Sequence, residues 1–508
     1  MTAMSDNRSN DPAFAPRRRR RVTGRIAMGF LILFLLCLVT AVATFFWWTR
    51  DTQSRLQAEI DAIHARGEPV TLAEITYFRQ GQLLPEQNAF TLYQQASDSL
   101  EALPDDVLLL APGFDEASVR SSLELLNDYP DWRREHTDKA TAFLIACQPA
   151  LDLIRQARGM DGVPTIGPKA PDKSAPPELD DPNLSGARQL AKLSLLAATM
   201  AHEAGDDNEA FEHLRDILQI RDLVGEHPTT IPSLVQVSIT ALAAKCLEHI
   251  TPTLKIGDGP GEVDLADVRE LAERLIQSER LLEVARKAMI SERVRAYELM
   301  HSDIIQDNLR HASFLAESVT SNIIDANLAV SLRYWSIKSA KLRTANRYNP
   351  DHAVTPEDRQ WLEEFFSDDW GRVKEAIYIA VSLLCPSFDR YDLVVYRGLA
   401  SQRMAGLALL MRAYEVETGQ PVATLDDLVP RYLTALPEDP FSPTGQPPRY
   451  IPDGPHPRLY CLNDNQQDDG GDFGETIPSK SWNPKDWPFF LNDTRHLVQE
   501  RDELPKER

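Results

Sequence analysis

The chain has 508 residues, a formal net charge of −22 and 43% apolar residues. This apolar share is sufficient for hydrophobic cores, which excludes a chain disordered along its whole length, and the length has room for roughly two to four domains. The acidic surplus argues against nucleic-acid backbones as ligands of most of the surface, because like charges repel.

The N-terminal region joins a basic cluster to an uncharged apolar segment. Arg17 to Arg21 are five consecutive arginines, and Ile26 to Trp48 contains 23 residues without a charged side chain. A membrane-spanning helix needs roughly 20 apolar residues, because it must pair its own backbone groups inside hydrocarbon. The sequence therefore predicts a cytoplasmic basic arm at 1–25 and a transmembrane helix at 26–48, which makes the lipid bilayer a partner.

Basic residues favour the cytoplasmic side, and aromatic residues favour the membrane–water interfaces. Phe45 to Trp48 would lie at the outer interface, so residues 49–508 are expected outside the cytoplasmic (inner) membrane. Residues 1–50 carry a net charge of +6, which leaves −28 for residues 51–508. A second interpretation stays open, since Ala41-Val42-Ala43 resembles a signal-peptidase site with cleavage after Ala43. Both interpretations export the remainder.

The five cysteines show no metal-binding pattern. Cys37 lies in the apolar segment, and the other four, Cys147, Cys246, Cys385 and Cys461, lack CxxC or Cys/His spacing. A zinc site is therefore not expected. A long-range disulfide stays open, and the sequence does not choose among the three ways of pairing four cysteines. We expect most of the four to be buried free thiols.

Residues 49–163 have helical apolar spacing, and residues 164–186 interrupt it. Six prolines and few apolar side chains in 164–186 indicate an extended linker, because such a segment buries too little apolar surface to offset the entropy of ordering it.

Residues 187–345 are expected to form a helical-hairpin domain. Leu193 to Leu218 resembles one tetratricopeptide hairpin, but no second copy follows at a period of about 34 residues, so we describe the domain as repeat-like. Ile231 to Ile250 is apolar on most sides, which predicts a central helix. Val263 to about His301 is predicted as one long amphipathic helix.

The last third of the chain is divided into three parts. Residues 346–387 form a connecting helical segment, 388–480 a small domain and 481–508 a tail. A long helix is predicted from Asp389 to Glu417, ending at Gly419, with short strands after it. The aromatic residues of the tail either fold back on the small domain or anchor a partner; they are Trp482, Trp487, Phe489 and Phe490.

Residues 400–475 carry a recognisable set of motifs: Thr424-Leu425-Asp426-Asp427-Leu428-Val429-Pro430, Leu436-Pro437-Glu438-Asp439-Pro440, Arg449-Tyr450 and Tyr460-Cys461-Leu462-Asn463-Asp464. This stretch resembles the C-terminal part of the major pseudopilin of type II secretion systems. The resemblance implies a long helix on a small antiparallel sheet, followed by a calcium loop. It implies Asp464 as a ligand, with Asp468, Asp469 and Asp472 as candidates for the remaining acids and Leu462 for a backbone carbonyl.

The same loop has a physical interpretation of its own. Four aspartates within nine residues, separated by asparagine and glycine, offer oxygen ligands on a backbone that can curl. Calcium binds six to eight such oxygens. The alternative is a solvated acidic turn that binds nothing, and both stay open.

Two departures separate the chain from a pilin. Some 340 residues lie between Trp48 and the long helix that would correspond to a pilin stem, and that helix contains Asp392, Arg397 and Arg403. Charged residues are costly within a membrane, so this helix is not a membrane stem and assembly into a fibre is not expected. The chain also contains Gly67-Glu68-Pro69-Val70-Thr71-Leu72 and Leu84-Pro85-Glu86-Gln87-Asn88-Ala89, followed by a helical middle and this C-terminal part. This wider pattern resembles uncharacterised single-pass envelope proteins of Planctomycetes-like bacteria, which implies topology and little chemistry.

No familiar catalytic motif occurs. The sequence has no GxSxG, HExxH or P-loop motif, and Glu298 with His301 forms a lone ExxH where a di-iron bundle needs two. His202 and His213 could approach across the hairpin, but structural roles are favoured for both. No enzyme activity and no small-molecule substrate are predicted.

The predicted fold class is mainly α, with an N-terminal transmembrane helix, a helical-hairpin (repeat-like) extracytoplasmic region and a small C-terminal α+β pseudopilin-like domain. The predicted function is a membrane-anchored interaction or structural protein of the cell envelope, with a calcium-binding C-terminal module and an envelope protein as partner. The alternatives are an accessory component of a type II secretion or pilus-like system, and an envelope hydrolase without a recognisable motif.

Overall fold

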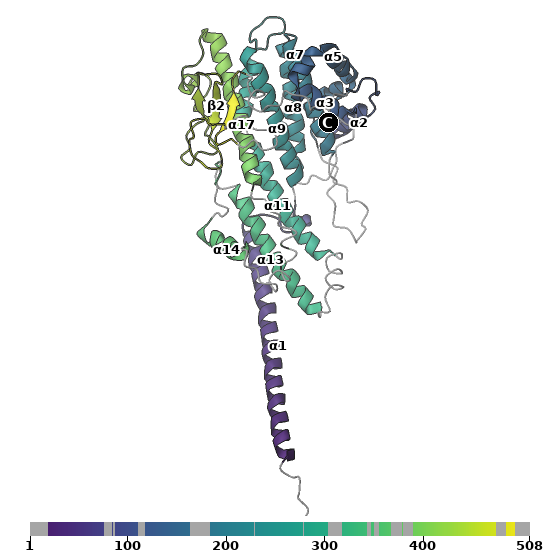
Figure 1. Ribbon diagram of the computed structural model, residues 1–508, viewed down its shortest axis with the longest axis vertical. Coiled ribbons are helices and arrows are strands. Elements are labelled where there is room, and N and C mark those ends of the chain that lie inside the picture. Colours follow the sequence, from purple (N-terminus) through teal and green to yellow (C-terminus); the bar gives the residue numbers. More distant parts are fainter. Residues whose placement is uncertain are drawn as a thin grey trace, which may run out of the picture.

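The protein consists mainly of helices, with one small sheet at its C-terminal end (Figure 1). The computed structural model describes residues 19–75, 84, 87–109, 117–162, 183–227, 229–277, 279–302, 317–342, 347–349, 355–366, 378, 381, 390–473 and 484–492. The predicted mainly helical class is confirmed. Most of the predicted basic arm and most of the segments 164–186 and 346–387 lie outside these residues.

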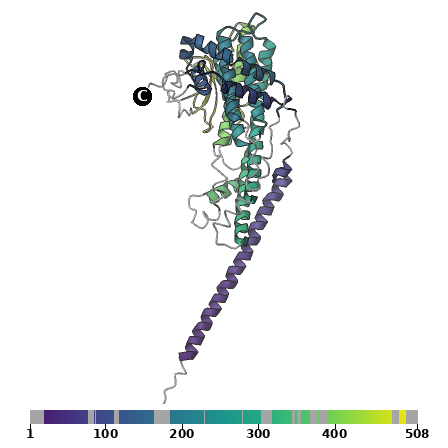
Figure 2. The same ribbon diagram turned by 90° about the vertical axis from the view of Figure 1, so that its right-hand side faces the viewer.

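Helix α1 (Arg19–Ala65) is a single helix of 47 residues that projects from the rest of the protein (Figures 1 and 2). Its part from Met28 onward contains an apolar stretch with a mean hydropathy of 2.6, none of it buried. The helical residues that follow the apolar segment are therefore continuous with it. No break separates residues 26–48 from the start of the region 49–163.

Two long helices run from the body of the protein toward the exposed part of α1. They are α11 (Arg280–His301) and α13 (Glu317–Lys341), which pack against each other, and α13 also packs along α1 (Figure 2). Leu332 of α13 meets Ile63 of α1, and lower down Leu328 meets Leu56. We call α11 and α13 the stalk helices.

The rest of the helical body lies farther from the exposed end of α1. Helices α7 and α8 form the predicted hairpin, in which Gly205 adopts a positive φ of 86° and Asp206 caps α8 by accepting a hydrogen bond from Glu209 N. Several shorter helices cover this hairpin on one side. The body helices are α2 (Ala89–Glu101), α3 (Val119–Asp128), α4 (Pro130–Glu135), α5 (Thr137–Ala146), α6 (Gln148–Gln156), α7 (Leu184–Glu203) and α8 (Asp207–Val224).

Helix α9 (Thr230–Ile250) occupies the centre, as predicted, because it packs against α7, α8, α11 and α17 (Tyr391–Thr418). The single long helix predicted from Val263 to His301 is wrong. Two helices are present instead, α10 (Leu265–Gln277) and α11, and Glu279 between them has non-helical backbone angles. Because of this break, α10 packs against α17, whereas α11 packs against α9 and α13.

Helix α17 (Tyr391–Thr418) and a three-stranded sheet form the C-terminal part. The helix ends at Gly419, whose φ of 71° provides the left-handed cap that glycine adopts without strain. The antiparallel strands are ordered β1 (Arg449–Ile451), β2 (Arg458–Cys461) and β3 (Trp487–Phe490). The predicted boundary at residue 480 cuts this sheet, because β3 belongs to the segment assigned to a tail.

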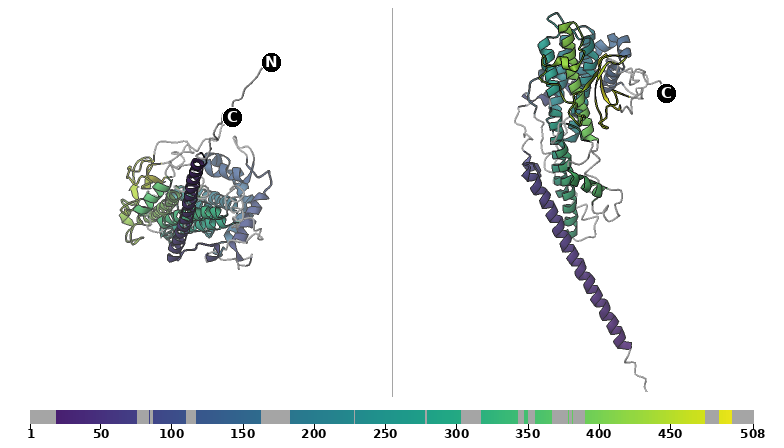
Figure 3. Two further views of the ribbon diagram at one scale, coloured as in Figure 1. Left: turned by 90° about the horizontal axis from the view of Figure 1, so that it is seen from below. Right: turned by 90° about the vertical axis from the view of Figure 1, so that its left-hand side faces the viewer.

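The tail aromatics therefore fold back, and Phe489 and Phe490 are buried. Trp482 lies outside the described residues. The sheet stands at the side of the body opposite α2 to α6, as the view from below also shows (Figures 1 and 3). Helix α17 packs so closely on α10 that a Cβ on Gly406 would lie 2.8 Å from the Ala272 carbonyl oxygen. The predicted C-terminal module thus shares one hydrophobic core with the helical body.

Two smaller expectations are also resolved. The predicted linker boundary at residue 186 is too late, because α7 begins at Leu184 and Asn183 caps it by accepting a hydrogen bond from Gly186 N. Cys147, Cys246 and Cys461 are buried free thiols, as expected of most of the cysteines, while Cys385 lies outside the described residues.

Candidate cation site at the C-terminal sheet

A buried aspartate fixes the start of the acidic loop. Asp439 is fully buried, and its Oδ2 accepts hydrogen bonds from Leu462 N and Arg449 Nη1, both at 2.9 Å. Its Oδ1 accepts a third from Phe441 N at 2.8 Å. Burial raises the pKa of Asp439 although these donors oppose the shift. Leu462, the predicted carbonyl ligand, is thereby held at the end of β2 with its amide directed at Asp439.

Asp468 turns back toward the sheet. Its carboxylate accepts hydrogen bonds from Arg449 Nε at 2.9 Å, from the Tyr460 hydroxyl at 3.1 Å and from Gly470 N at 3.0 Å. Partial desolvation would raise the pKa of Asp468, but these donors and the arginine charge lower it on balance. Asp468 is therefore ionised at neutral pH and already has a cationic neighbour.

Asp486, which directly precedes β3, lies beneath the acidic loop. Its side chain is fully buried, and Oδ2 accepts hydrogen bonds from Gly471 N at 2.7 Å and from Asp469 N at 3.1 Å. Its Oδ1 has no hydrogen-bond partner among the described residues. Burial, assisted by the charges of Asp469 and Asp468, raises the pKa of Asp486 to about 6. An ionised, incompletely satisfied carboxylate in this position is unfavourable unless a cation or a proton joins it.

The remaining predicted ligands point in different directions. Asp464 is exposed and lies near the charge of Arg397, whereas Asp472 forms an ion pair with Lys485 at 2.9 Å. Asp469 Oδ2 accepts a hydrogen bond from Asn465 Nδ2 at 2.8 Å. Among the residues that the structure describes, no three acid, histidine or cysteine side chains converge closely enough to hold a metal ion.

The loop thus offers carboxylate oxygens, the type of ligand that calcium binds, but only some of them lie close to one another. The charges of Asp468 and Asp469 both act on Asp486, whose unsatisfied Oδ1 is buried beneath the loop. Sequence reasoning missed Asp486, because it follows the acidic run by 14 residues and joins it only through β3. An isolated Asp before a strand of aromatic residues gave no signal.

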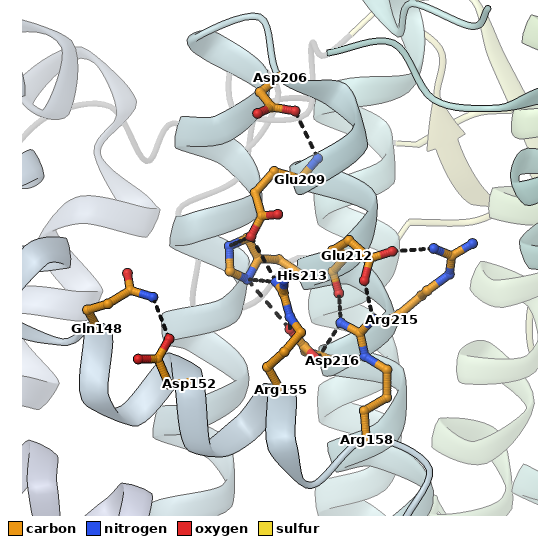
Figure 4. A network of polar contacts seen from close by, with 10 residues as sticks. All are labelled: Gln148, Asp152, Arg155, Arg158, Asp206, Glu209, Glu212, His213, Arg215 and Asp216. Carbon is orange, nitrogen blue, oxygen red and sulfur yellow. Dashed lines mark hydrogen bonds and ion pairs between the residues drawn. The ribbon is translucent and has the colours of Figure 1, made fainter. Parts of the chain in front are cut away.

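A second cluster of charged residues links α6 and α8 (Figure 4). Asp216 is buried and accepts hydrogen bonds from Arg155 Nε at 3.2 Å and Arg158 Nε at 3.0 Å. Arg155 also reaches Glu209 at 2.9 Å, and Arg158 also pairs with Glu212. Each carboxylate already faces a guanidinium, so this network holds two helices together and leaves no charge to recruit a ligand.

The histidines considered from the sequence have structural partners. His213 belongs to the network of Figure 4 through Glu209, while His202 bonds to Asp207 and to the Thr253 hydroxyl, so the two rings have separate environments. In the lone ExxH, Glu298 accepts the amide of Leu72 at 2.8 Å, and His301 bonds to the Tyr297 carbonyl at 2.9 Å.

Comparison with known proteins adds no relative: no family model, no curated protein and no solved structure matches this chain. The resemblance to a pseudopilin module therefore remains a prediction from the motifs.

Proposed function

We propose that this protein is a single-pass membrane protein that holds a helical body and a small sheet outside the cytoplasmic membrane, as an interaction or structural component of the cell envelope. The observation that carries the proposal is helix α1. One continuous helix exposes an apolar segment long enough to cross a bilayer and then packs, through Ile63, against the stalk helix α13.

The exposed side chains explain why α1 requires a bilayer. Phe30, Val39 and Phe46 are 69%, 65% and 68% exposed, and a contiguous apolar surface of this extent is unfavourable in water. The arginines of the N-terminal cluster favour the cytoplasm, which supports an extracytoplasmic location for the body. A body held this way meets partners in the envelope.

Topology is tested with reporters fused to the C-terminus of the full chain. We expect activity from a reporter that works only outside the cytoplasm and none from one that works only inside it. The opposite result would refute the proposed location. The mass of the purified protein separates an intact anchor from cleavage after Ala43, because cleavage removes the first 43 residues.

We further propose that the acidic loop binds calcium through Asp468, Asp469 and Asp486, with Asp464 and Asp472 joining when the loop closes on the ion. The buried, unsatisfied Oδ1 of Asp486 supports this assignment. Binding to the folded state alone raises stability. The melting temperature of the full chain in detergent should therefore rise from chelator to millimolar calcium.

The variant Asp486→Asn should lose most of this calcium-dependent shift, because it removes the negative charge at the centre of the site. Asp453→Asn is the matched control, since Asp453 is exposed and lies outside the loop. Equal melting of the wild-type chain in chelator and in calcium would show that the loop is a solvated acidic turn.

A further inference from the structure

The stalk helix α13 runs parallel to α1. Hydrogen bonds between the two helices show how far α13 extends toward the exposed part of α1. At the upper end, Arg66 Nη2 donates a hydrogen bond to the Ser336 hydroxyl at 3.0 Å. At the lower end, Asn322 Nδ2 donates one to the Thr49 hydroxyl at 2.6 Å. Asn322 is five residues from the N-terminal end of α13, which therefore begins about 7 Å nearer the exposed part of α1 than Thr49.

Burial along α1 shows where packing against protein begins. Thr52 is only 5% exposed, and Phe45 and Trp48 are partly covered. Phe46 and Trp47, on the other side of the helix, are 68% and 65% exposed. The aromatic group at the end of the apolar segment is thus divided: one side is partly covered and the other is mostly exposed.

A polar chain joins the two helices at this level. Asn322 is 1% exposed and donates to Thr49 Oγ1, which in turn donates to the Phe45 carbonyl at 3.0 Å. These groups satisfy one another's hydrogen bonds at the level where the bilayer around α1 would meet water. The N-terminal part of α13 carries Thr320, Ser321 and Asn322, polar residues that suit a hydrated headgroup layer and not hydrocarbon.

We propose that the N-terminal turn of α13 contacts the headgroup layer of the same bilayer that α1 spans. This inference rests on the proposed function, since it needs α1 in the membrane. The body then stands on the bilayer at two places, the exit of α1 and the lower end of the stalk. The bilayer is favoured as the occupant of this end because it is continuous with the aromatic interface group at Phe46 and Trp47.

Two-place contact has a mechanical consequence. A single flexible tether would let the body tilt and swivel, whereas a rigid α1 packed on α13 holds it in one orientation. Helix α1 continues 17 residues beyond Trp48, which raises its packed end about 25 Å above the interface. The C-terminal sheet is thus kept away from the membrane and available to an envelope partner.

The test uses the full chain reconstituted in nanodiscs, with a fluorescent amino acid at one exposed position and a nitroxide quencher on the lipid headgroups. Ser321→fluorophore reports the lower end of α13. Ala62→fluorophore is the matched control on α1, exposed like Ser321 and about 20 Å above Thr49. We expect several-fold stronger quenching at Ser321 than at Ala62. Equal, weak quenching at both positions would overturn the inference.

A third label separates this inference from the anchoring on which it depends. Leu36 lies within the apolar segment and is 58% exposed, so a fluorophore there should be quenched by nitroxides on the acyl chains. Strong quenching at Leu36 together with weak quenching at Ser321 refutes only the stalk contact. Absence of quenching at Leu36 refutes the membrane anchor itself.

Discussion

Helices α1 and α9 are the two helices among the described residues that are long and apolar enough to cross a membrane, yet they have opposite surroundings. The apolar part of α1 has a mean hydropathy of 2.6 and no buried residue, whereas α9 has a mean hydropathy of 1.4 and two thirds of its apolar window is buried. Both helices meet the same requirements of length and apolar composition. The contacts made by each helix decide whether its apolar surface is covered by protein or left exposed.

The polar residues of α9 explain why it belongs inside the body. The Ser233 hydroxyl bonds to the Tyr391 hydroxyl at 2.7 Å, and Glu248 Oε1 accepts the amide of Phe490 at 2.9 Å. Such partners come from α17 and β3, far along the chain. Buried polar groups need partners of this kind, and a helix in lipid cannot obtain them from its solvent.

The sharpest test of the comparison is one aspartate placed in each helix. Ile239→Asp in α9 buries an unpaired charge at a fully buried position, and we expect the free energy of unfolding to fall by more than about 4 kcal/mol. Ile32→Asp in α1, where Ile32 is 52% exposed, should leave the body folded and weaken membrane insertion by about 3 kcal/mol. Denaturant unfolding and membrane fractionation measure the two effects. An equal loss of folding stability in both variants would contradict the assignment of α9 to the protein core and of α1 to the membrane.

The attachment of α1 to the body gives the next largest effect. Glu68, just beyond α1, accepts a hydrogen bond at 2.9 Å from Arg293 of α11, and both side chains are buried. Glu68→Gln leaves the arginine charge without its buried carboxylate, so we expect a loss of about 3 kcal/mol in denaturant unfolding. The matched control is Glu124→Gln, which breaks the more exposed pairs with Arg120 and Lys192 and should cost less than about 1 kcal/mol. Similar losses in both would show that the buried pair is not an attachment point.

A third comparison uses glycine in two helices. A Cβ at Gly406 of α17 would come within 2.8 Å of the Ala272 carbonyl oxygen, so Gly406→Ala should lower the free energy of unfolding by about 2 kcal/mol. At Gly29 of α1 no atom lies within 4 Å of the added Cβ. Gly29→Ala should therefore leave the unfolding of the body unchanged. Tolerance of alanine at both sites would show that α17 is packed less closely than described.

The smallest expected effect concerns pH and Asp486. Its pKa of about 6 in the folded state exceeds the ordinary 3.8, so the folded protein binds a proton that the unfolded chain does not. The free energy of unfolding should therefore rise as pH falls from 7 to 5, by about 1–2 kcal/mol in chelator. Asp486→Asn should remove this rise. An unchanged pH profile in the variant would place the titrating group elsewhere.

The C-terminal region illustrates how far sequence reasoning extends. The long helix, its end at Gly419 and the presence of short strands after it were predictable, because a glycine cap and local apolar patterns depend on neighbouring residues. Strand β3 and Asp486 were missed, since pairing with β2 joins residues about 30 positions apart and leaves no local trace. The predicted calcium ligands were found in one loop, but Asp472 faces Lys485 and Asp464 lies toward Arg397.

The sequence alone determined that this chain is mainly helical, that it has an uncharged apolar segment of membrane-spanning length beside five arginines, and that its remainder is acidic. These properties follow from composition and from spacing within single helices, which act locally. Only the tertiary structure decided that α1 and α13 pack side by side, that α17 shares its core with α9 and α10, and that a buried carboxylate lies beneath the acidic loop. Each of these depends on which distant surfaces pack together, and side-chain shape and burial settle that in three dimensions.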